Sequence, residues 1–569
     1  MKRNGIDVGK IIHNGRYVDK IIHNGNTVYT KPVPIIVAGE DIAVNGNMET
    51  GDPPTGWVPN NSTLDAETTT VSEGLQALKI INSTSYGKAY LPVTTEAGSW
   101  YRITADIHKG DCSAVGFEFR NEGSAQISTI DSKSGTGYQS AEITGQAEAT
   151  SIRPTIIAPT GTAGQYVFAD NFMCKKLDLS TLIDAIDTKV SGVSVETKIV
   201  FTKGYQAGIV VSLDSKTDPK NFIVAYIRIT GSTYKLLIDK YIDGTRSNLA
   251  TTNITYVSGY KLKVTTSEGT IKAYYNDVQI GTDLVAKDIS IIYNTIHGLF
   301  NTSPLNTFSG TIITEIAPSA ATKLMVFALI SDTHIGYESW LEGELSAMFS
   351  TINLFENVTF AILPGDTLDS GYDSTPELQA AQYAQYVAAS AVFTKPIYAY
   401  RGNHDVDVDQ FLSHGVIEVN GVRLIFFHAD YVGLAEPPDY TNTGDVTAAE
   451  LAWLETQLQV SATHKILVCH WSIVTGDANF PWPITDEHGR LEVLALANTY
   501  GVKLYLNGHE HNAILSTGTA GVLTDVNCPT ASGTGAFLIC TVYADKIVID
   551  MHKVKTPFEY VKSIEVALV

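Results

Sequence analysis

Five short polar blocks late in the chain contain the residue types that bind divalent metal ions. Imidazole nitrogens combined with carboxylate and amide oxygens suit several such ions. Two ions held close together also need one carboxylate that bridges them, and Asp366 is the candidate for that bridge. The blocks are Asp332-Thr-His334, Gly365-Asp366-Thr-Leu-Asp369-Ser-Gly371, Gly402-Asn403-His404-Asp405, His470 and Gly508-His509-Glu-His511.

Each block follows an apolar run that is typical of a buried strand. The carboxyl ends of strands in sheets that alternate with helices meet in one crevice, so residues far apart in sequence should meet there. We therefore expect the five blocks to form one site. The strand-like runs are 324–331, 360–363, 397–400, 466–469 and 502–506.

Helical signals separate these runs. Apolar residues at helical spacing predict a helix from Leu341 to Phe355, and Thr375-Pro376 has the cap and first-turn proline of a second helix. Thr447-Ala-Ala-Glu450 reads as a capping box that opens a third helix, and a fourth run ends before Gly501. The alternation predicts a layered α/β domain over 319–569.

The order and spacing of the blocks resemble the calcineurin-like metallophosphoesterase family over roughly 319–569, in its pattern D-x-H, GD-x-x-D-x-G, GNHD, H and GHxH. The resemblance implies hydrolysis of a phosphomonoester or phosphodiester with two divalent ions, of manganese, iron, zinc or nickel. It implies that the first ion binds Asp332, His334, Asp366 and His511, and that the second binds Asp366, Asn403, His470 and His509.

The same resemblance assigns catalytic roles beside the ions. Asn403 would hold phosphoryl oxygens, His404 would contact the substrate phosphate and help the leaving group depart, and Asp405 would orient His404. Asp369 is expected to support the site by hydrogen bonding. Arg401 is either a phosphate contact or a solvated arginine at a strand end. Cys469 and Trp471, which flank His470, depart from the pattern of many relatives and bear on substrate preference.

Each ligand candidate also has an ordinary structural explanation. An aspartate can cap a helix, an asparagine can shape a turn, and a lone histidine can be a buried residue with satisfied hydrogen bonds. These explanations would have to hold for every block at once, in the family's order, so the metal centre is the better interpretation. Five histidines match no block and are expected at the surface or in the core: His414, His428, His464, His488 and His552.

Composition limits the classes of protein that fit. At 569 residues the chain should divide into several domains. A formal net charge of −21 argues against binding to nucleic acid or to an anionic membrane surface. Five cysteines without CxxC spacing indicate neither a disulfide framework nor a zinc knuckle. We expect no signal peptide and no membrane span.

Residues 1–33 repeat a short motif, Lys10-Ile-Ile-His-Asn-Gly15 and Lys20-Ile-Ile-His-Asn-Gly25. Asn-Gly between short β-rich runs predicts two-residue hairpin turns. Such small hairpins cannot bury a core alone, so they should pack on a partner or on other copies of the chain. The segment resembles the attachment segments of bacteriophage tail proteins. His13 and His23 are read as strand residues beside the turns rather than as metal ligands.

Residues 34–178 alternate apolar with small polar residues and predict a β-sandwich. They resemble the jelly-roll carbohydrate-binding modules found beside glycosidases and in phage tails. The resemblance implies a structural calcium ion, with Glu49 and Asp170 as candidate ligands. Aromatic side chains could stack on sugar rings or belong to the core. They are Trp57, Tyr86, Tyr90 and Trp100.

Residues 179–318 predict a second all-β jelly-roll-type sandwich after a helix-compatible turn at 179–184. The region resembles laminin-G or concanavalin-type sandwiches. Its acidic residues are scattered, so no ligand site is assigned. A spacer or an oligomerisation role fits as well as sugar binding.

Three functions remain open from the sequence. The first is a metal-dependent phosphohydrolase on a phage tail, in the virion, or on a similar extracellular surface structure, acting on phosphate esters of host envelope glycans or phosphopolymers. Its expected partners are other tail proteins and further copies of the chain. The second is a receptor-binding adhesin with vestigial hydrolysis, which the complete ligand set argues against. The third is a cellular phosphatase or nuclease with sugar-binding modules.

Overall fold

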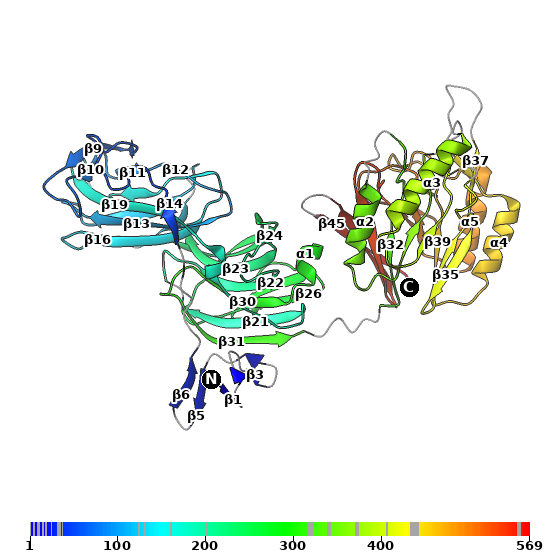
Figure 1. The fold of residues 1–569 in the computed structure, drawn as a ribbon, viewed down its shortest axis with the longest axis horizontal. Helices are drawn as coiled ribbons and strands as arrows, with labels where there is room; N and C mark the ends of the chain where they lie inside the picture. The colour runs from blue at the N-terminus through cyan, green and yellow to red at the C-terminus, as the bar shows by residue number, and fades with distance from the viewer. Residues whose placement is uncertain are drawn as a thin grey trace. The chain divides into compact units, whose positions relative to one another are not determined.

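The computed structural model divides the chain into two compact units, residues 1–318 and 319–569. The structure describes short strands within 2–30 and then residues 36, 38–122, 126–129, 133–159, 162–200, 202–230, 232–316, 323–337, 343–369, 375–405, 408–432, 443–554 and 559–569. Each unit is described by itself below (Figure 1).

The first unit contains a sandwich of two antiparallel sheets over residues 38–177. One sheet has the order β16 (Gln139–Gln146), β13 (Trp100–His108), β19 (Tyr166–Leu177), β10 (Ala77–Asn82) and β9 (Ser62–Glu67), and β7 (Ala38–Asp41) also pairs with β19. The other has the order β15 (Gln126–Thr129), β14 (Gly116–Arg120), β18 (Thr155–Ile157), β11 (Lys88–Tyr90) and β8 (Val58–Asn60). The short strands β12 (Val93–Thr94) and β17 (Ser151–Ile152) pair separately.

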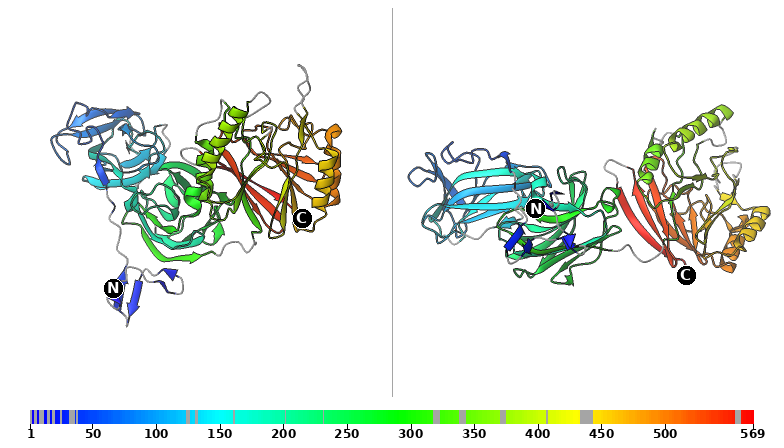
Figure 2. Two further views of the ribbon diagram at one scale, coloured as in Figure 1. Left: turned by 45° about the vertical axis from the view of Figure 1, so that its right-hand side comes forward. Right: turned by 60° about the horizontal axis from the view of Figure 1, so that its bottom comes forward.

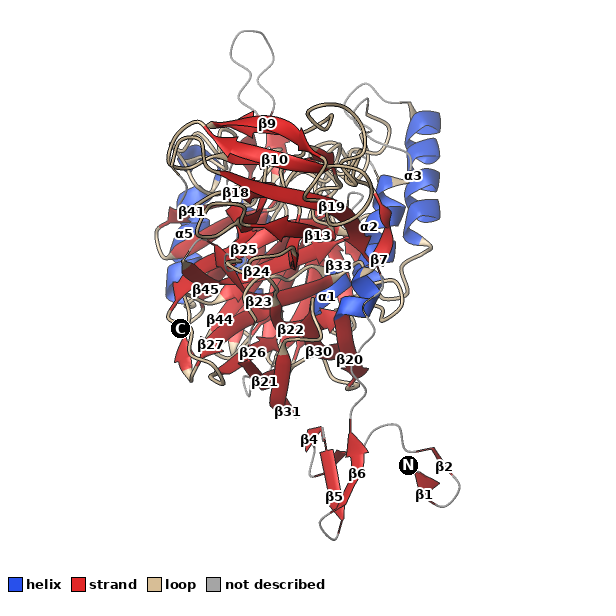
Figure 3. Ribbon diagram, turned by 90° about the vertical axis from the view of Figure 1, so that its left-hand side faces the viewer, coloured by secondary structure: helices blue, strands red, loops and turns tan. Residues whose placement is uncertain are grey.

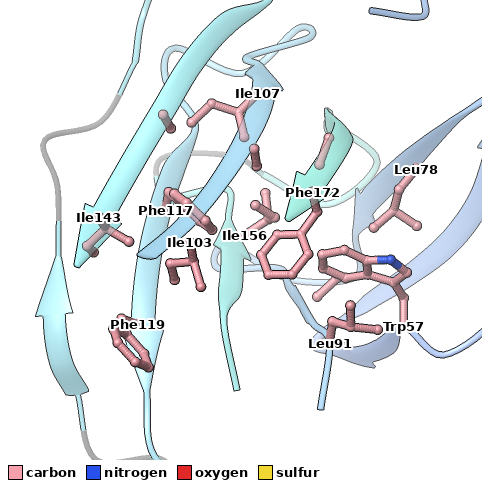
Figure 4. Packing of buried hydrophobic residues seen from close by; sticks show 14 of the residues in the cluster. Trp57, Leu78, Leu91, Ile103, Ile107, Phe117, Phe119, Ile143, Ile156 and Phe172 are labelled. Carbon is pink, nitrogen blue, oxygen red and sulfur yellow. The ribbon is translucent and has the colours of Figure 1, made fainter. Parts of the chain in front are cut away.

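The core of this sandwich is filled from both sheets (Figure 4). Trp57 meets Phe172 edge to face, with ring centroids 5.6 Å apart, and is only 6% exposed. Trp100 is 2% exposed. These two tryptophans are therefore core residues, whereas Tyr86 is 39% exposed and Tyr90 is partly exposed.

A second pair of antiparallel sheets follows a 3-10 turn at Leu179–Leu182. The first sheet has the order β20 (Ile183–Asp187), β30 (Ile296–Asn301), β22 (Ala207–Leu213), β23 (Phe222–Thr230), β24 (Thr233–Ile242) and β25 (Thr245–Ile254). The facing sheet has the order β28 (Val278–Gln279), β27 (Thr270–Tyr275), β26 (Lys261–Ser267), β21 (Val193–Val200) and β31 (Thr307–Glu315), and β29 (Leu284–Val285) also pairs with β27. A single helical turn, α1 (Ile289–Ile292), precedes β30.

Buried contacts join the two sandwiches within this unit. Trp100 of the first sandwich lies against Phe300 and Tyr226 of the second, and its indole N–H donates to the Tyr241 hydroxyl at 3.3 Å. The Thr144 hydroxyl donates to the Gln206 side chain at 2.7 Å. The junction therefore has the apolar filling and the satisfied polar groups of a protein interior.

The strands at the start of the chain pair as hairpins around the Asn-Gly positions. β3 (Ile12–His13) pairs with β4 (Arg16–Tyr17), and β5 (Lys20–His23) pairs with β6 (Asn26–Thr30). A third pair, β1 (Lys2–Arg3) with β2 (Ile6–Asp7), flanks Asn4-Gly5 and was not predicted. The side chains of His13 and His23 lie outside the described residues.

The second unit places two mixed sheets face to face between helices. One sheet has the order β34 (Ile397–Ala399), β33 (Phe360–Leu363), β32 (Met325–Leu329), β43 (Ala536–Val542), β44 (Lys546–Lys553) and β45 (Glu559–Ala567). The other has the order β35 (Gly415–Val419), β36 (Val422–Phe426), β39 (His464–Val468), β40 (Leu504–Asn507), β42 (Leu523–Asn527) and β41 (Ser516–Ala520). A short pair, β37 (Asp430–Val432) with β38 (Thr443–Asp445), stands apart.

Apolar residues of both sheets fill the space between them, and helices cover the outer faces (Figure 2). Helices α2 (Glu344–Asn353) and α3 (Pro376–Ser390) lie beside the first sheet, and α4 (Ala448–Leu458) and α5 (Arg490–Thr499) lie beside the second. Figure 3 shows that these helices are the main departure from an otherwise strand-rich chain. The arrangement is a four-layer α/β unit.

The helix starts agree with their predicted caps, with one difference. The Thr375 and Thr447 side chains accept backbone N–H groups at the starts of α3 and α4. Glu450, however, does not complete a capping box, because its carboxylate accepts from the backbone N–H of His428 at 3.0 Å. The expected start at Leu341 lies outside the described residues, and α2 begins at Glu344.

No helix among the described residues has the length and apolar character needed to cross a membrane. All five cysteines are buried and free.

His297 makes the stability of the first unit sensitive to acid. Its ring is fully buried, Nδ1 accepts from the backbone N–H of Ser212 at 3.0 Å, and Nε2 lies 3.0 Å from the Val190 carbonyl oxygen. This arrangement fits only the neutral ring, because protonated Nδ1 could not accept. Burial lowers the pKa of His297 to about 4.

The unfolded chain therefore takes up a proton here at a higher pH than the folded chain. The free energy of unfolding should fall by about 3 kcal/mol as the pH drops from the ordinary histidine value through the folded pKa. Hydrogen exchange of peptides from β22 and β30, measured in the full chain across this pH range, checks the expectation. His297→Gln should remove most of that pH dependence, and an unchanged slope in the variant would contradict it.

Candidate metal centre

The five blocks lie at the carboxyl ends of five parallel strands of the second unit. Strands β32, β33 and β34 of the first sheet lead to Asp332, Asp366 and Asn403. Strands β39 and β40 of the second sheet lead to His470 and His509. The site is therefore built from both sheets.

The first group of ligand atoms joins Asp332, His334, Asp366 and His511, whose candidate atoms all lie within 4.8 Å of one another. The Nε2 atoms of His334 and His511 are 2.8 Å apart. His511 Nε2 lies 3.5 Å from Asp332 Oδ1, and His334 Nε2 lies 3.7 Å from Asp366 Oδ2. Two carboxylates and two imidazoles thus surround one point.

The second group joins Asp366, His470 and His509, again within 4.8 Å. His470 Nε2 lies 3.1 Å from Asp366 Oδ2, 3.2 Å from His509 Nδ1 and 3.0 Å from Asn403 Oδ1. Asp366 belongs to both groups. The structure therefore brings together all seven residues predicted to bind metal.

The residues present fit divalent ions. Asp366 Oδ2 is buried, and no described residue gives it a hydrogen bond of good geometry, although a buried carboxylate oxygen normally has one. The other carboxylate oxygen is satisfied, because Asp366 Oδ1 accepts from the backbone N–H of His404 at 2.8 Å. A cation between the two groups would give Asp366 Oδ2 a partner, and mixed nitrogen and oxygen ligands suit such an ion.

Two glycines allow the ligand loops to approach each other. A Cβ at Gly402 would lie 2.2 Å from Asp366 Oδ1, and one at Gly508 would lie 2.5 Å from Asp332 Oδ2. Both distances are too short for any side chain. Gly402 and Gly508 must therefore be glycines, because ligands from other loops occupy the space that a side chain would need.

Several ligands adopt a backbone conformation that is unfavourable for their residue type. Asp332, His334, Asp366, His509 and His511 have φ values between 44° and 67°. Non-glycine residues in this left-handed region are uncommon and tend to occur at functional sites. The turns aim the side chains into the site at a cost in backbone energy.

Charge is distributed so that the carboxylates remain ionised. Burial alone would raise the pKa of Asp332, but His511 and His470 lower it to about 2. Burial is likewise outweighed at Asp366, where His470, His334 and His404 hold the pKa well below its usual range. His509 is different, because burial and the neighbouring His470 lower its pKa and keep it neutral.

Asp369 lies beside the His404 ring, and the orienting role expected of Asp405 stays a prediction. His404 Nδ1 lies 3.0 Å from Asp369 Oδ1, and the same oxygen lies 3.2 Å from His334 Nδ1. The Asp405 carboxylate is fully buried and accepts backbone N–H groups of Thr367, Leu368 and Gly402. Asp405 thus joins two ligand loops.

Arg401 forms its described contacts away from the ligand atoms. Its Nε donates to the Phe411 carbonyl oxygen at 3.3 Å, and its guanidinium lies 3.3 Å from the exposed carboxylate of Asp409. These contacts favour the solvated strand-end interpretation, and a phosphate contact stays a prediction.

A buried polar network under the His509 turn was missed from the sequence. Asp525, on β42, accepts the backbone N–H of Ile473 at 2.9 Å and contacts the Asn507 amide. Glu510 accepts from the Ser472 hydroxyl at 2.5 Å and from the backbone N–H of Trp482 at 3.3 Å. Burial raises the pKa of both carboxyls to about 7. Glu510 could have been suspected from its place between two ligands, whereas nothing near Asp525 marks it.

The aromatic residues near the site divide into core and surface. Trp471 and Phe480 are each 1% exposed and belong to the core beneath α4 and α5. Trp482 is 39% exposed, with its ring centroid 5.9 Å from that of His509. Tyr337 is 55% exposed beside His334, at 6.2 Å. One exposed ring therefore flanks each metal group.

The remaining histidines of the unit lie outside the two metal groups. His414 stacks on Trp453 and contacts Glu450. His428 contacts Asp430, and His488 contacts Asp445. His464 contacts the Ala544 carbonyl oxygen, and His552 is buried among aromatic rings.

The candidate calcium ligands of the first unit bind one loop. Glu49 accepts the backbone N–H groups of Leu75 and Gln76, and Asp170 accepts those of Ser72 and Glu73. The two carboxylates share this loop, and a calcium ion between them stays a prediction.

Residues 325–513 match the calcineurin-like phosphoesterase family, so the second unit contains a calcineurin-like phosphoesterase domain. No curated protein matches the chain. Similar solved structures include GAP50, the anchor in the inner membrane complex of Plasmodium, at 15% identity over 43% of this chain and 89% of that one, with a TM-score of 0.31. Purple acid phosphatase PPD1 from yellow lupin (Lupinus luteus) is 10% identical over 85% and 94%, with a TM-score of 0.32. TmCBM61, solved in complex with β-1,4-galactotriose, is 19% identical over 24% and 99%, with a TM-score of 0.21.

Gly402→Ala should displace Asp366 and reduce metal binding while the unit stays folded. Elemental analysis of manganese-loaded protein should show a clear loss of bound metal relative to the parent chain, with unchanged far-ultraviolet circular dichroism. Gly137→Ala is the matched control, because nothing lies within 4 Å of a Cβ at that position. Full metal content in Gly402→Ala would contradict the close-approach argument.

Proposed function

We propose that the second unit is a dinuclear, metal-dependent phosphoesterase. The observation that carries this proposal is the single carboxylate of Asp366, which belongs to both groups of ligand atoms. The family match over residues 325–513 supports the same reaction class. The first ion would be held by Asp332, His334, Asp366 and His511, and the second by Asp366, Asn403, His470 and His509.

Two bound divalent ions supply a nucleophile from water near neutral pH and offset the negative charge of a phosphate ester. The chain's own residues do the remaining work. Asn403 is 6% exposed at the end of β34, where its amide can hold a phosphoryl oxygen as well as an ion. The exposed rings of Trp482 and Tyr337 lie near His509 and His334 and can contact the organic part of an ester.

His404 is placed to stabilise the leaving oxygen. Burial alone would lower its pKa, but Asp369, Asp366 and Asp405 raise the pKa of His404 to about 9, so the ring carries a proton at neutral pH. Asp369 Oδ1 lies 3.0 Å from Nδ1 of His404 and can fix the orientation of the ring. A positioned imidazolium can pass this proton to the departing oxygen.

We further propose that this phosphoesterase is carried on a phage tail or a similar surface structure and acts on phosphate esters of envelope polymers. The paired strands at the start of the chain support an attachment role, and the two sandwiches ahead of the phosphoesterase support a binding role. The other interpretation, an adhesin without hydrolysis, predicts a protein that is silent in every phosphatase assay.

Hydrolysis of bis(p-nitrophenyl) phosphate and of p-nitrophenyl phosphate with added manganese tests the reaction class. We expect release of p-nitrophenol from at least one of the two, lost on chelation and regained on adding metal. Asp366→Asn should abolish activity because both groups lose their shared ligand. Full activity in that variant would refute the dinuclear site, and silence of the parent chain with every metal would favour the adhesin.

His404→Gln should lower kcat by roughly 10²-fold or more with both metals retained, since it removes a general acid. Asp369→Asn should also lower kcat, by less, because it weakens the orientation of His404 without removing it. Metal analysis beside kinetics separates these effects from ligand loss. Equal kcat in His404→Gln and the parent chain would remove His404 from the mechanism.

A further inference from the structure

The outer face of one sheet of the first sandwich carries a basic pocket. Strand alternation directs Ala89, Phe117 and Ile156 into the core, so their strand neighbours point away from it. The pocket is open to solvent and has a cavity volume of about 80 Å³. It is lined by Asn60, Lys88, Tyr90, Arg120, Arg153 and Thr155.

Three of these six lining residues are cations, in a chain whose net charge is −21. Arg120 is paired with Glu118 at 2.5 Å. Lys88 forms no ion pair with any residue that the structure describes, and Arg153 has only a 3.9 Å contact with Glu122, whose side chain is 58% exposed. An exposed pair of this kind contributes little. Among the described residues, the nearest buried carboxylate to these cations is thus Glu118, which already pairs with Arg120.

The cations lie close enough to affect one another. Burial and the nearby Arg120 lower the pKa of Lys88, and Glu118 compensates only in part. Concentrating like charges in a partly buried pocket costs free energy. An anion bound there would remove that cost.

Two tyrosines hold the cations in place. Lys88 Nζ lies 4.9 Å from the ring centroid of Tyr86, and Arg153 Cζ lies 5.1 Å from that of Tyr90. Cation–π contacts of this length are attractive. Stacking of these tyrosines on sugar rings stays a prediction, and the structure places a cation near each ring. Recognition at this face would depend on charge rather than on ring stacking.

We propose that this pocket binds a single oxyanion group, a phosphate or a carboxylate. Guanidinium and ammonium groups are the usual partners of both anions. The cations gather around one pocket of limited size, which fits one anionic group better than the repeated phosphates of a nucleic acid. This site belongs to the first unit and does not depend on the phosphoesterase proposal.

Ligand-observed NMR titration of the full chain tests the proposal. The probes are inorganic phosphate, a hexose 6-phosphate, a hexuronate and the neutral hexose, in an Asp366→Asn background that weakens the metal site as an alternative phosphate site. We expect the charged sugars to bind at least about ten-fold more tightly than the neutral hexose, and about one molar salt to weaken them strongly. The hexose phosphate and the hexuronate distinguish phosphate from carboxylate as the preferred group.

Lys88→Gln and Arg153→Gln should each weaken binding of the charged sugars about ten-fold. The matched control is Lys79→Gln on the other sheet, because Lys79 Nζ also lies over a tyrosine ring, at 4.5 Å from the centroid of Tyr166. Circular dichroism checks that each variant is folded. If one pocket variant does not fold, the other still tests the proposal. The proposal would be overturned if charged and neutral sugars bound equally, or if a short oligonucleotide bound more tightly than either charged sugar. It would also be overturned if Lys79→Gln lost as much binding as the pocket variants.

Discussion

The second unit depends on burying several charged groups at one point. Asp332, Asp366 and Asp405 are at most 1% exposed, and isolated carboxylates in such places would be strongly unfavourable. Two different solutions appear side by side. Asp405 accepts backbone N–H groups of two loops. Asp332 and Asp366 each accept one backbone N–H group, from His509 and His404, and also face imidazoles. The Asp405 carboxylate shapes the site, and the Asp332 and Asp366 carboxylates leave oxygen atoms available to ions.

Positioning these groups requires unfavourable backbone conformations, and the packing of the sheets stabilises those conformations. The left-handed ligand residues follow directly after fully buried strands, whose registers are fixed by neighbours on both sides. A loop with fewer constraints would relax toward ordinary φ values. The strained turns therefore persist because rigid, apolar strands hold both of their ends, and the resulting precision is what a metal centre requires.

Sequence reasoning succeeded where a local signal carried the information. The strand-end blocks, the caps at Thr375 and Thr447 and the family's spacing could all be read directly. It failed where a residue acts through the tertiary fold. Nothing near Asp525 indicates that it supports the His509 turn, and the partner of His404 could be assigned only once Asp369 and Asp405 were seen in space. The aromatic residues of the first sandwich divide in the same way, because burial separates Trp57 and Trp100 from Tyr86 and Tyr90.

The strand order of the second unit also constrains how the chain can fold as it is made. Strand β32 begins the unit, yet its neighbour β43 lies more than two hundred residues later, after all ligands have been synthesised. Until β43 has been synthesised, the edge of β32 that faces away from β33 has no partner strand. A chain truncated before β43 would therefore expose an unpaired apolar strand prone to aggregation.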